Sequence, residues 1–116
     1  MSWIAFLSDK QRELMTKNLL KAHVSYLKEI TNTGELKLCG PLLDGTAIMI
    51  FNVDTEQHAR SLVASDPFSK ASYYKTVRFA EFMEANMENE FLLTDALTQM
   101  DSSEYKASLH TESANS

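Results

Sequence analysis

The sequence predicts an α+β fold in which one antiparallel sheet carries two helices on one of its faces. The chain has 116 residues, of which 44% are apolar, and this amounts to one compact domain. Apolar residues repeat with strand-like spacing in four segments and with helical spacing in two. The segments run strand, helix, strand, strand, helix, strand along the chain. This order is typical of the ferredoxin-like βαββαβ arrangement.

The first half of the predicted unit begins with a strand over residues 3–7, a short apolar run. Ser8-Asp9 offers a cap for the helix that follows, which has helical period over residues 11–31. Gly34 suits the left-handed position that often ends a helix. One face of this helix carries Thr16, Leu20, Val24, Leu27 and Thr31, with Leu19 and Ile30 at its edge.

Two strands and a hairpin are predicted next. Residues 35–39 alternate between polar and apolar, and Gly40-Pro41 interrupts them. Asp44-Gly45 is a turn signal within a hairpin connection. Residues 47–53 are the clearest strand, since they are uncharged and apolar on both faces. We therefore expect the sheet face that the helices leave bare to be buried in a homodimer.

The second helix and the last strand complete the unit. Asp54-Thr55 caps a helix over residues 56–64, and residues 76–83 form the fourth strand. Between them, Asp66 is a favoured N-cap residue and Pro67 a favoured first helical residue. The sequence predicts a short helix that begins at Pro67.

Charge divides the chain at about residue 84. Residues 1–84 hold ten basic and ten acidic side chains, whereas residues 85–116 hold one and six. We predict a compact domain over 1–84 and an acidic extension over 85–116. Residues 84–90 are compatible with a helix, residues 91–100 with a short amphipathic helix that packs on its own domain or on a partner subunit, and residues 101–116 with a flexible tail.

Composition excludes several classes of function. A neutral domain without a basic stripe argues against a nucleic-acid partner. The chain has one cysteine, so no disulfide can form within it, which fits a reducing compartment. Its longest apolar run, residues 47–51, is far too short to span a membrane. Its three glycines are not clustered, and no metal-ligand spacing is present, so we expect neither a nucleotide cofactor nor a metal. A soluble cytoplasmic protein is expected.

Three residues are candidates for chemistry. His23 shares a helix face with apolar residues, so it is either a hydrogen-bonded core histidine or a titratable group in a site. Asp66 is either a helix cap alone or also a partner of that histidine. Cys39 suggests a nucleophilic triad with the other two, but no signature surrounds it and a small buried residue is the simpler interpretation. His58 lies among polar residues and is expected at the surface.

Four pieces of sequence in register resemble the YciI-like (YCII-related) family over residues 3–83. They are Ala22-His23-Val24-Ser25-Tyr26-Leu27, Gly34-Glu35-Leu36, Cys39-Gly40-Pro41-Leu42, and Asp66-Pro67-Phe68 followed by Ala71. The resemblance implies a ferredoxin-like dimer of the α+β barrel type. It also implies a pocket centred on a His–Asp pair, here His23 and Asp66. We expect the lining of this small-molecule pocket to include Cys39, Gly40, Pro41 and Phe68.

The resemblance also implies a class of reaction. One branch of the family removes chloride from a chlorinated hydroxyquinone, and similar folds include a lactone isomerase, so proton transfer on small cyclic molecules is expected. A binding module without catalysis is the alternative. Two departures stand out: Cys39 replaces the usual Ser or Ala before Gly-Pro, and Ser72 follows Ala71 where the family often has Gly. Loss of that glycine is expected to narrow the approach of the backbone beside the pocket.

Overall fold

The computed structural model describes residues 2–101, and these fall into two compact units that divide between Met83 and Glu84. Of the predicted tail over residues 101–116, only Asp101 lies within the described residues. No helix of the described part is long and apolar enough to cross a membrane.

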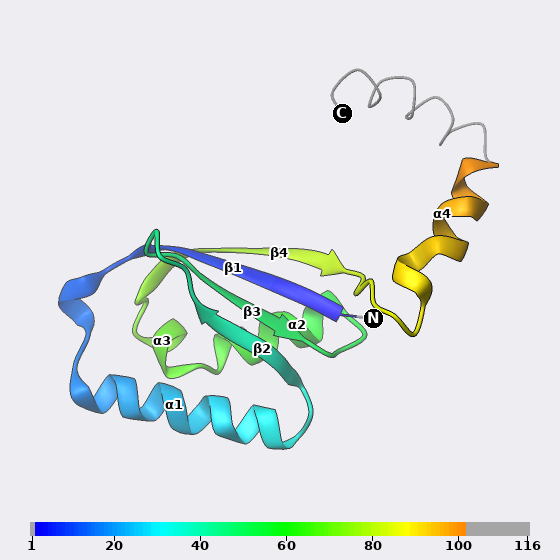
Figure 1. Cartoon of the computed structure of the whole chain (residues 1–116). Coiled ribbons are helices and arrows are strands. Elements are labelled where there is room, and N and C mark those ends of the chain that lie inside the picture. Colours follow the sequence, from blue (N-terminus) through cyan, green and yellow to red (C-terminus); the bar gives the residue numbers. More distant parts are fainter. Residues whose placement is uncertain (1, 102–116) are drawn as a thin grey trace. The chain divides into compact units, whose positions relative to one another are not determined.

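The first unit is a four-stranded antiparallel sheet in the order β2-β3-β1-β4, with helices on one face (Figure 1). Its strands are β1 (Ser2–Lys10), β2 (Leu36–Pro41), β3 (Ala47–Phe51) and β4 (Tyr74–Phe82). Its helices are α1 (Lys17–Asn32), α2 (Glu56–Ala64) and the short α3 (Pro67–Lys70), with a 3₁₀ turn, η1 (Arg12–Leu14), before α1. The predicted ferredoxin-like fold is confirmed.

The hydrophobic core lies between the sheet and the helices. Alternate residues of β1 and β3 point toward the helices, because successive side chains of a strand face opposite sides. The buried cluster comprises Ala5, Leu7, Ile30, Leu36, Met49, Phe51, Val53, Ala59, Leu62 and Val63. The hydroxyl of Tyr26 donates a hydrogen bond to the carbonyl of Leu62 and so ties α1 to α2.

Helix α1 differs from the prediction at its start and in the face that it buries. It begins at Lys17 because the Thr16 hydroxyl accepts a hydrogen bond from the Leu19 N–H and caps the helix. Leu20 and Val24, predicted within the inner face, are 46% and 40% exposed. The face that meets the sheet is turned toward Leu19, His23, Tyr26, Leu27 and Ile30.

Strand β1 is longer than predicted. Ser8-Asp9, expected to cap a helix, lies within β1, which continues to Lys10. Strand β4 begins at Tyr74, two residues before its predicted start, and Lys10 pairs with Tyr74 across the two strands. The paired strands therefore extend past the apolar residues from which they were predicted.

Strand β2 was also predicted to end too early. Gly40-Pro41 was expected to interrupt the strand, but both residues pair with β3. A proline has no N–H to donate to a neighbouring strand. It is tolerated there because β2 is an edge strand, which has no neighbour on one side. Strand β3 ends at Phe51, shorter than the predicted 47–53.

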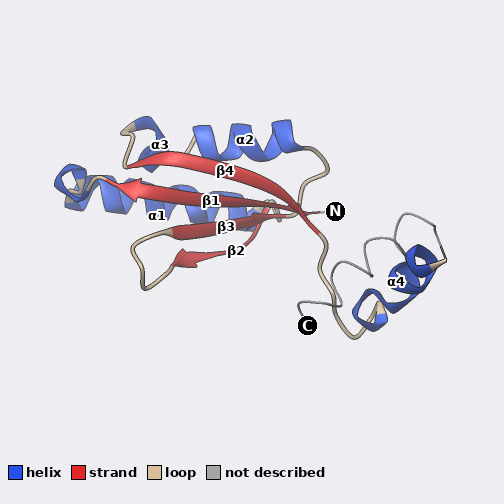
Figure 2. Ribbon diagram, turned by 90° about the horizontal axis from the view of Figure 1, so that it is seen from above, coloured by secondary structure: helices blue, strands red, loops and turns tan. Residues whose placement is uncertain are grey.

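The opposite face of the sheet carries no helix of this unit (Figure 2). The strand pairing aligns Leu38, Ile50 and Ile4 across three strands on this face, with Phe6 beside Ile48 in the next row. Leu38 is 57% exposed. The face is therefore largely apolar, and the Arg78 guanidinium of β4 lies 4.1 Å from the centre of the Phe6 ring on it.

The second unit contains a 3₁₀ turn, η2 (Glu90–Leu92), and helix α4 (Leu93–Met100). Residues 84–89, predicted as compatible with a helix, are not helical. Asn86 and Asn89 instead exchange side-chain to backbone hydrogen bonds and form a turn. Helix α4 corresponds to the amphipathic helix predicted over residues 91–100, and its Leu93, Leu97 and Met100 are exposed.

Candidate functional site

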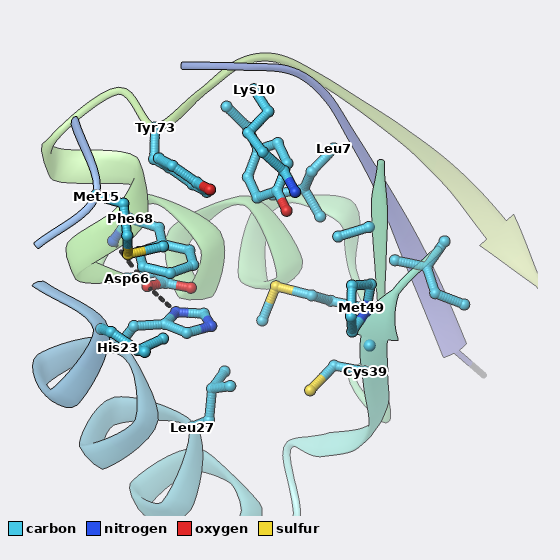
Figure 3. A pocket seen from close by; sticks show the side chains of 16 residues that line it. Leu7, Lys10, Met15, His23, Leu27, Cys39, Met49, Asp66, Phe68 and Tyr73 are labelled. Atoms are coloured by element: carbon cyan, nitrogen blue, oxygen red, sulfur yellow. Dashed lines mark hydrogen bonds and ion pairs between the residues drawn. The ribbon is translucent and has the colours of Figure 1, made fainter. Parts of the chain in front are cut away.

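A cavity of about 390 Å³ lies between α1, α3 and the helix-facing side of the sheet (Figure 3). Its volume is at the lower end of the range for small-molecule sites, and its walls are mostly apolar. The lining includes all six residues expected at a pocket, which are His23, Cys39, Gly40, Pro41, Asp66 and Phe68. They come from α1, from the edge strand β2 and from the start of α3.

His23 and Asp66 are in hydrogen-bond contact. The Nδ1 atom of His23 lies 2.8 Å from the Oδ1 atom of Asp66. The side chains are 16% and 3% exposed, so the contact is largely shielded from water. An ionised carboxylate only accepts hydrogen bonds, and its position therefore assigns the ring proton to Nδ1. The Nε2 atom then carries the lone pair of the neutral ring and points into the cavity (Figure 3).

Asp66 also caps α3, and it does so with the same oxygen. The backbone N–H of Phe68 donates to Asp66 Oδ1 at 2.9 Å. The two carboxylate oxygens do not divide these roles between them. Oδ1 accepts both the hydrogen bond from His23 and the one from the Phe68 N–H. No residue within 2–101 hydrogen-bonds Oδ2, although Asp66 as a whole is only 2% exposed.

The His23 ring is fixed on its flat side as well. The ring of Phe68 stacks on it with centroids 3.6 Å apart and planes that differ by 3°. Phe68 is itself held by contacts with Tyr73 and Tyr74. Proline at the first position of α3 fixes the backbone directly between the cap at Asp66, which meets the Nδ1 edge of His23, and Phe68, which stacks on its face.

Cys39 lines the cavity but is not joined to the pair. No hydrogen bond connects its Sγ atom to His23 in the described part of the chain, and its side chain comes from β2 on the far wall (Figure 3). Burial, and then the negative charge of Asp66, raise the pKa of the Cys39 thiol. A thiol that stays protonated is a poor nucleophile, so the triad interpretation is not supported.

The backbone conformation of Ser72 gives a different reason for the glycine that the family often has at this position. Its φ is 57°, a left-handed conformation that glycine adopts without steric cost. Ser72 is exposed and does not line the cavity, so its side chain does not narrow the backbone approach there. The conformation, rather than the space, favours glycine at this position.

Lys10, Tyr73 and Tyr74 also line the cavity, and the sequence patterns did not identify them. The two tyrosines follow α3 directly, and an aromatic pair after the Asp-Pro-Phe segment was a signal that could have found them. Lys10 gave no such signal, because its side chain reaches the cavity only through the shape of the β1 backbone.

His58, the other histidine of the described residues, does not line the cavity. His58, expected at the surface, hydrogen-bonds the Glu35 carboxylate at 2.6 Å with its side chain 46% exposed. Among residues 2–101 no three His, Cys, Asp or Glu side chains are grouped as metal ligands.

Comparison with known proteins places this fold. No curated protein sequence matches the chain. A similar solved structure is the 5-chloro-2-hydroxyhydroquinone dehydrochlorinase of Burkholderia phenoliruptrix, in complex with 2,5-dihydroxybenzoquinone. It is 19% identical, superposes with a TM-score of 0.62, and the match covers 72% of this chain and 95% of the dehydrochlorinase.

The sequence pattern of the YCII-related domain matches residues 1–83. This range coincides with the first unit, which ends at Met83, and includes all of the residues that line the cavity. The chain therefore belongs to the YCII-related domain family.

Proposed function

We propose that this protein is a small-molecule enzyme in which His23 moves a proton and Asp66 orients and charge-stabilises its ring. The observation that carries the proposal is the 2.8 Å contact between His23 Nδ1 and Asp66 Oδ1 at the wall of a cavity. A carboxylate behind one ring nitrogen leaves the other to act on a bound molecule, an arrangement used by many general bases.

The chemistry follows from the two states of the ring. Neutral His23 accepts a proton at Nε2 from an acidic C–H or O–H of the substrate, and the electron pair of that bond forms a new π bond. In an elimination, a leaving group such as chloride departs with its own electron pair. In an isomerisation, the imidazolium returns the proton to another atom. Asp66 stabilises the imidazolium in both cases because its charge is shielded from water.

The substrate class follows from the shape and lining of the cavity. A volume of about 390 Å³ suits a molecule of roughly one ring. Apolar walls favour a cyclic body, and the polar groups favour a few oxygen substituents. The likeness in fold to the dehydrochlorinase supports halogenated hydroxyquinones as the first substrates to test, with lactones as the second.

The test compares wild type with His23→Ala and His58→Ala on a panel of lactones and halogenated hydroxyquinones. Wild type should turn over at least one compound, and His23→Ala should lower the rate by about 10²–10⁴-fold. His58→Ala removes a histidine from the surface and should leave the rate unchanged. Equal turnover by wild type and His23→Ala, or none by wild type, would refute the proposal.

A binding module without catalysis is the competing function, and the mostly apolar lining is compatible with it. The two are separated by recovering the ligand after incubation. Unchanged ligand released from a tight complex supports binding alone, whereas a product supports the enzyme.

We also propose that the chain forms a homodimer through the open face of the sheet. Ile4, Phe6, Leu38, Ile48 and Ile50 make this face apolar, and no helix of the first unit covers it, although Arg78 of β4 lies over the ring of Phe6. An apolar sheet face of this kind gains free energy when a second copy excludes water from it.

A further inference from the structure

One wall of the cavity is built where β1 ends and β4 begins. Lys10 and Tyr74 are directly opposed partners in the pairing of these strands, and both line the cavity. Directly opposed side chains of neighbouring strands lie on the same face of the sheet and within contact distance. Figure 3 shows the Lys10 side chain directed into the cavity, on the same side as Tyr73.

Lys10 reaches this position because the alternation of β1 is broken. Leu7 faces the helices, is 5% exposed and lines the same cavity. In a regular strand a residue three positions later points to the opposite face. Asp9, between them, has a φ of 59°, which a residue other than glycine seldom adopts and which costs free energy. Its carboxylate accepts a hydrogen bond from Thr76 on β4, which helps to hold this conformation.

The donors on this wall have no hydrogen-bond or ion-pair partners among the described residues. Within residues 2–101, no hydrogen bond or ion pair involves the Lys10 ammonium, and none involves the hydroxyls of Tyr73 and Tyr74. The carboxylate that lines the cavity, Asp66, is held by His23 and the Phe68 amide. Burial raises the pKa of Tyr74, so its hydroxyl remains a donor at neutral pH.

We propose that Lys10, with the hydroxyls of Tyr73 and Tyr74, binds an anionic oxygen of a cyclic substrate, a carboxylate or a phenolate. The inference rests on the proposed function in one respect, that the same molecule presents its proton to His23. A lysine in a mostly apolar wall forms a charge-assisted hydrogen bond with such an oxygen. When His23 takes the proton, the electron pair left behind delocalises toward the oxygen, and Lys10 stabilises that charge.

The experiment measures binding without turnover. Benzoate and benzamide have the same shape and differ in charge, and each is titrated into the full chain while its NMR spectrum is recorded. Wild type should bind benzoate about tenfold more tightly than benzamide, and Lys10→Met should abolish that preference. Lys21→Met, which removes an exposed lysine of α1 outside the cavity lining, should retain it. No benzoate binding by wild type, or a preference that survives Lys10→Met, overturns the anion site.

A second variant keeps the test decisive if Lys10→Met does not fold. Tyr74→Phe removes one hydroxyl and should lower affinity for benzoate several-fold and affinity for benzamide less, because a hydrogen bond to a charged oxygen is the stronger one; equal losses for both probes contradict the proposal. The two hypotheses also fail separately. Benzoate preference lost in Lys10→Met, without turnover of any compound, refutes the enzyme and retains the anion site. Turnover that depends on His23, with unchanged benzoate preference in Lys10→Met, retains the enzyme and refutes the anion site.

Discussion

The ring of Phe68 lies flat on the ring of His23, with centroids 3.6 Å apart, and both residues hydrogen-bond the same oxygen of Asp66. The start of α3 and the orientation of the histidine are therefore set by one atom. Fold and site share this contact, and substitutions at Asp66 can separate its two roles.

Asp66→Asn and Asp66→Ala should differ in stability but not in activity. Asparagine is as good an N-cap as aspartate, so Asp66→Asn should unfold at nearly the wild-type urea concentration, whereas Asp66→Ala should lose about 1–2 kcal/mol. Both remove the negative charge behind His23 and should lower turnover by about 10²-fold or more. Fluorescence of the single tryptophan, Trp3, follows the unfolding. Full activity of Asp66→Asn would show that the charge is not needed.

Cys39→Ala should retain turnover within a few-fold of wild type. The raised pKa of the thiol, caused mainly by burial, keeps it protonated at neutral pH, so it neither attacks a substrate nor replaces His23 as a base. The rate of reaction with a thiol reagent, followed against pH, should increase only at alkaline pH. A variant that loses as much turnover as His23→Ala would reinstate Cys39 in the chemistry.

Tyr26→Phe should destabilise the fold by about 1 kcal/mol, because it removes the hydrogen bond from α1 to the carbonyl of Leu62. Burial, and then the charge of Asp66, raise the pKa of Tyr26 from 10.0 to about 12. The folded state thus holds this proton more tightly than the unfolded state. Its contribution is fully present below about pH 10 and is lost as the pH rises toward about 12.

Ultraviolet titration of the phenol groups and urea unfolding at several alkaline pH values test this together. Tyr26→Phe should lack the last ionisation seen in wild type. A wild-type protein whose tyrosines all ionise near pH 10 would contradict the prediction.

Ser72→Gly should stabilise the protein by about 0.5–1 kcal/mol, because the left-handed φ of 57° is costly for serine and open to glycine. Ala71→Gly is the matched control, since Ala71 has a φ of −90° and gains no relief. Thermal and urea unfolding of the two variants measure the difference. Equal effects at both positions would show that strain at Ser72 is not the cause.

Leu38→Glu should convert the proposed dimer to a monomer, because it places a charge on the apolar open face of the sheet. Leu43→Glu is the control: Leu43 is fully exposed in the loop between β2 and β3. Light scattering gives the mass of each. A dimer that persists in Leu38→Glu excludes this face, and a variant that lacks residues 88–116 then shows whether the extension holds the subunits together.

The parts of the site that the sequence could predict are those with local causes. Asp66 followed by Pro67 is a cap and first-turn signature, and α3 begins there. Thr55 caps α2 for the same reason. The apolar run from Ala47 predicted β3, and the strand–helix order predicted the topology.

The parts that the sequence could not predict depend on contacts far along the chain. Thr16 has a residue type found in helices and at caps alike, and the helical pattern does not show that η1 takes up residues 12–14 and leaves Thr16 to cap α1. Lys10 lies three residues after the end of a predicted strand. No local sequence signal indicates that the backbone conformation of Asp9 directs the Lys10 side chain into the cavity. That conformation involves Thr76, which is 67 residues away.

The single oxygen that Asp66 uses for both its partners has a consequence for relatives of this protein. Asparagine at the corresponding position preserves the helix start, so natural selection for folding alone does not remove it. Selection for the proton transfer proposed above would remove it. Relatives with asparagine there should then be folded proteins that hold ligands without converting them, and this one position should separate binders from enzymes.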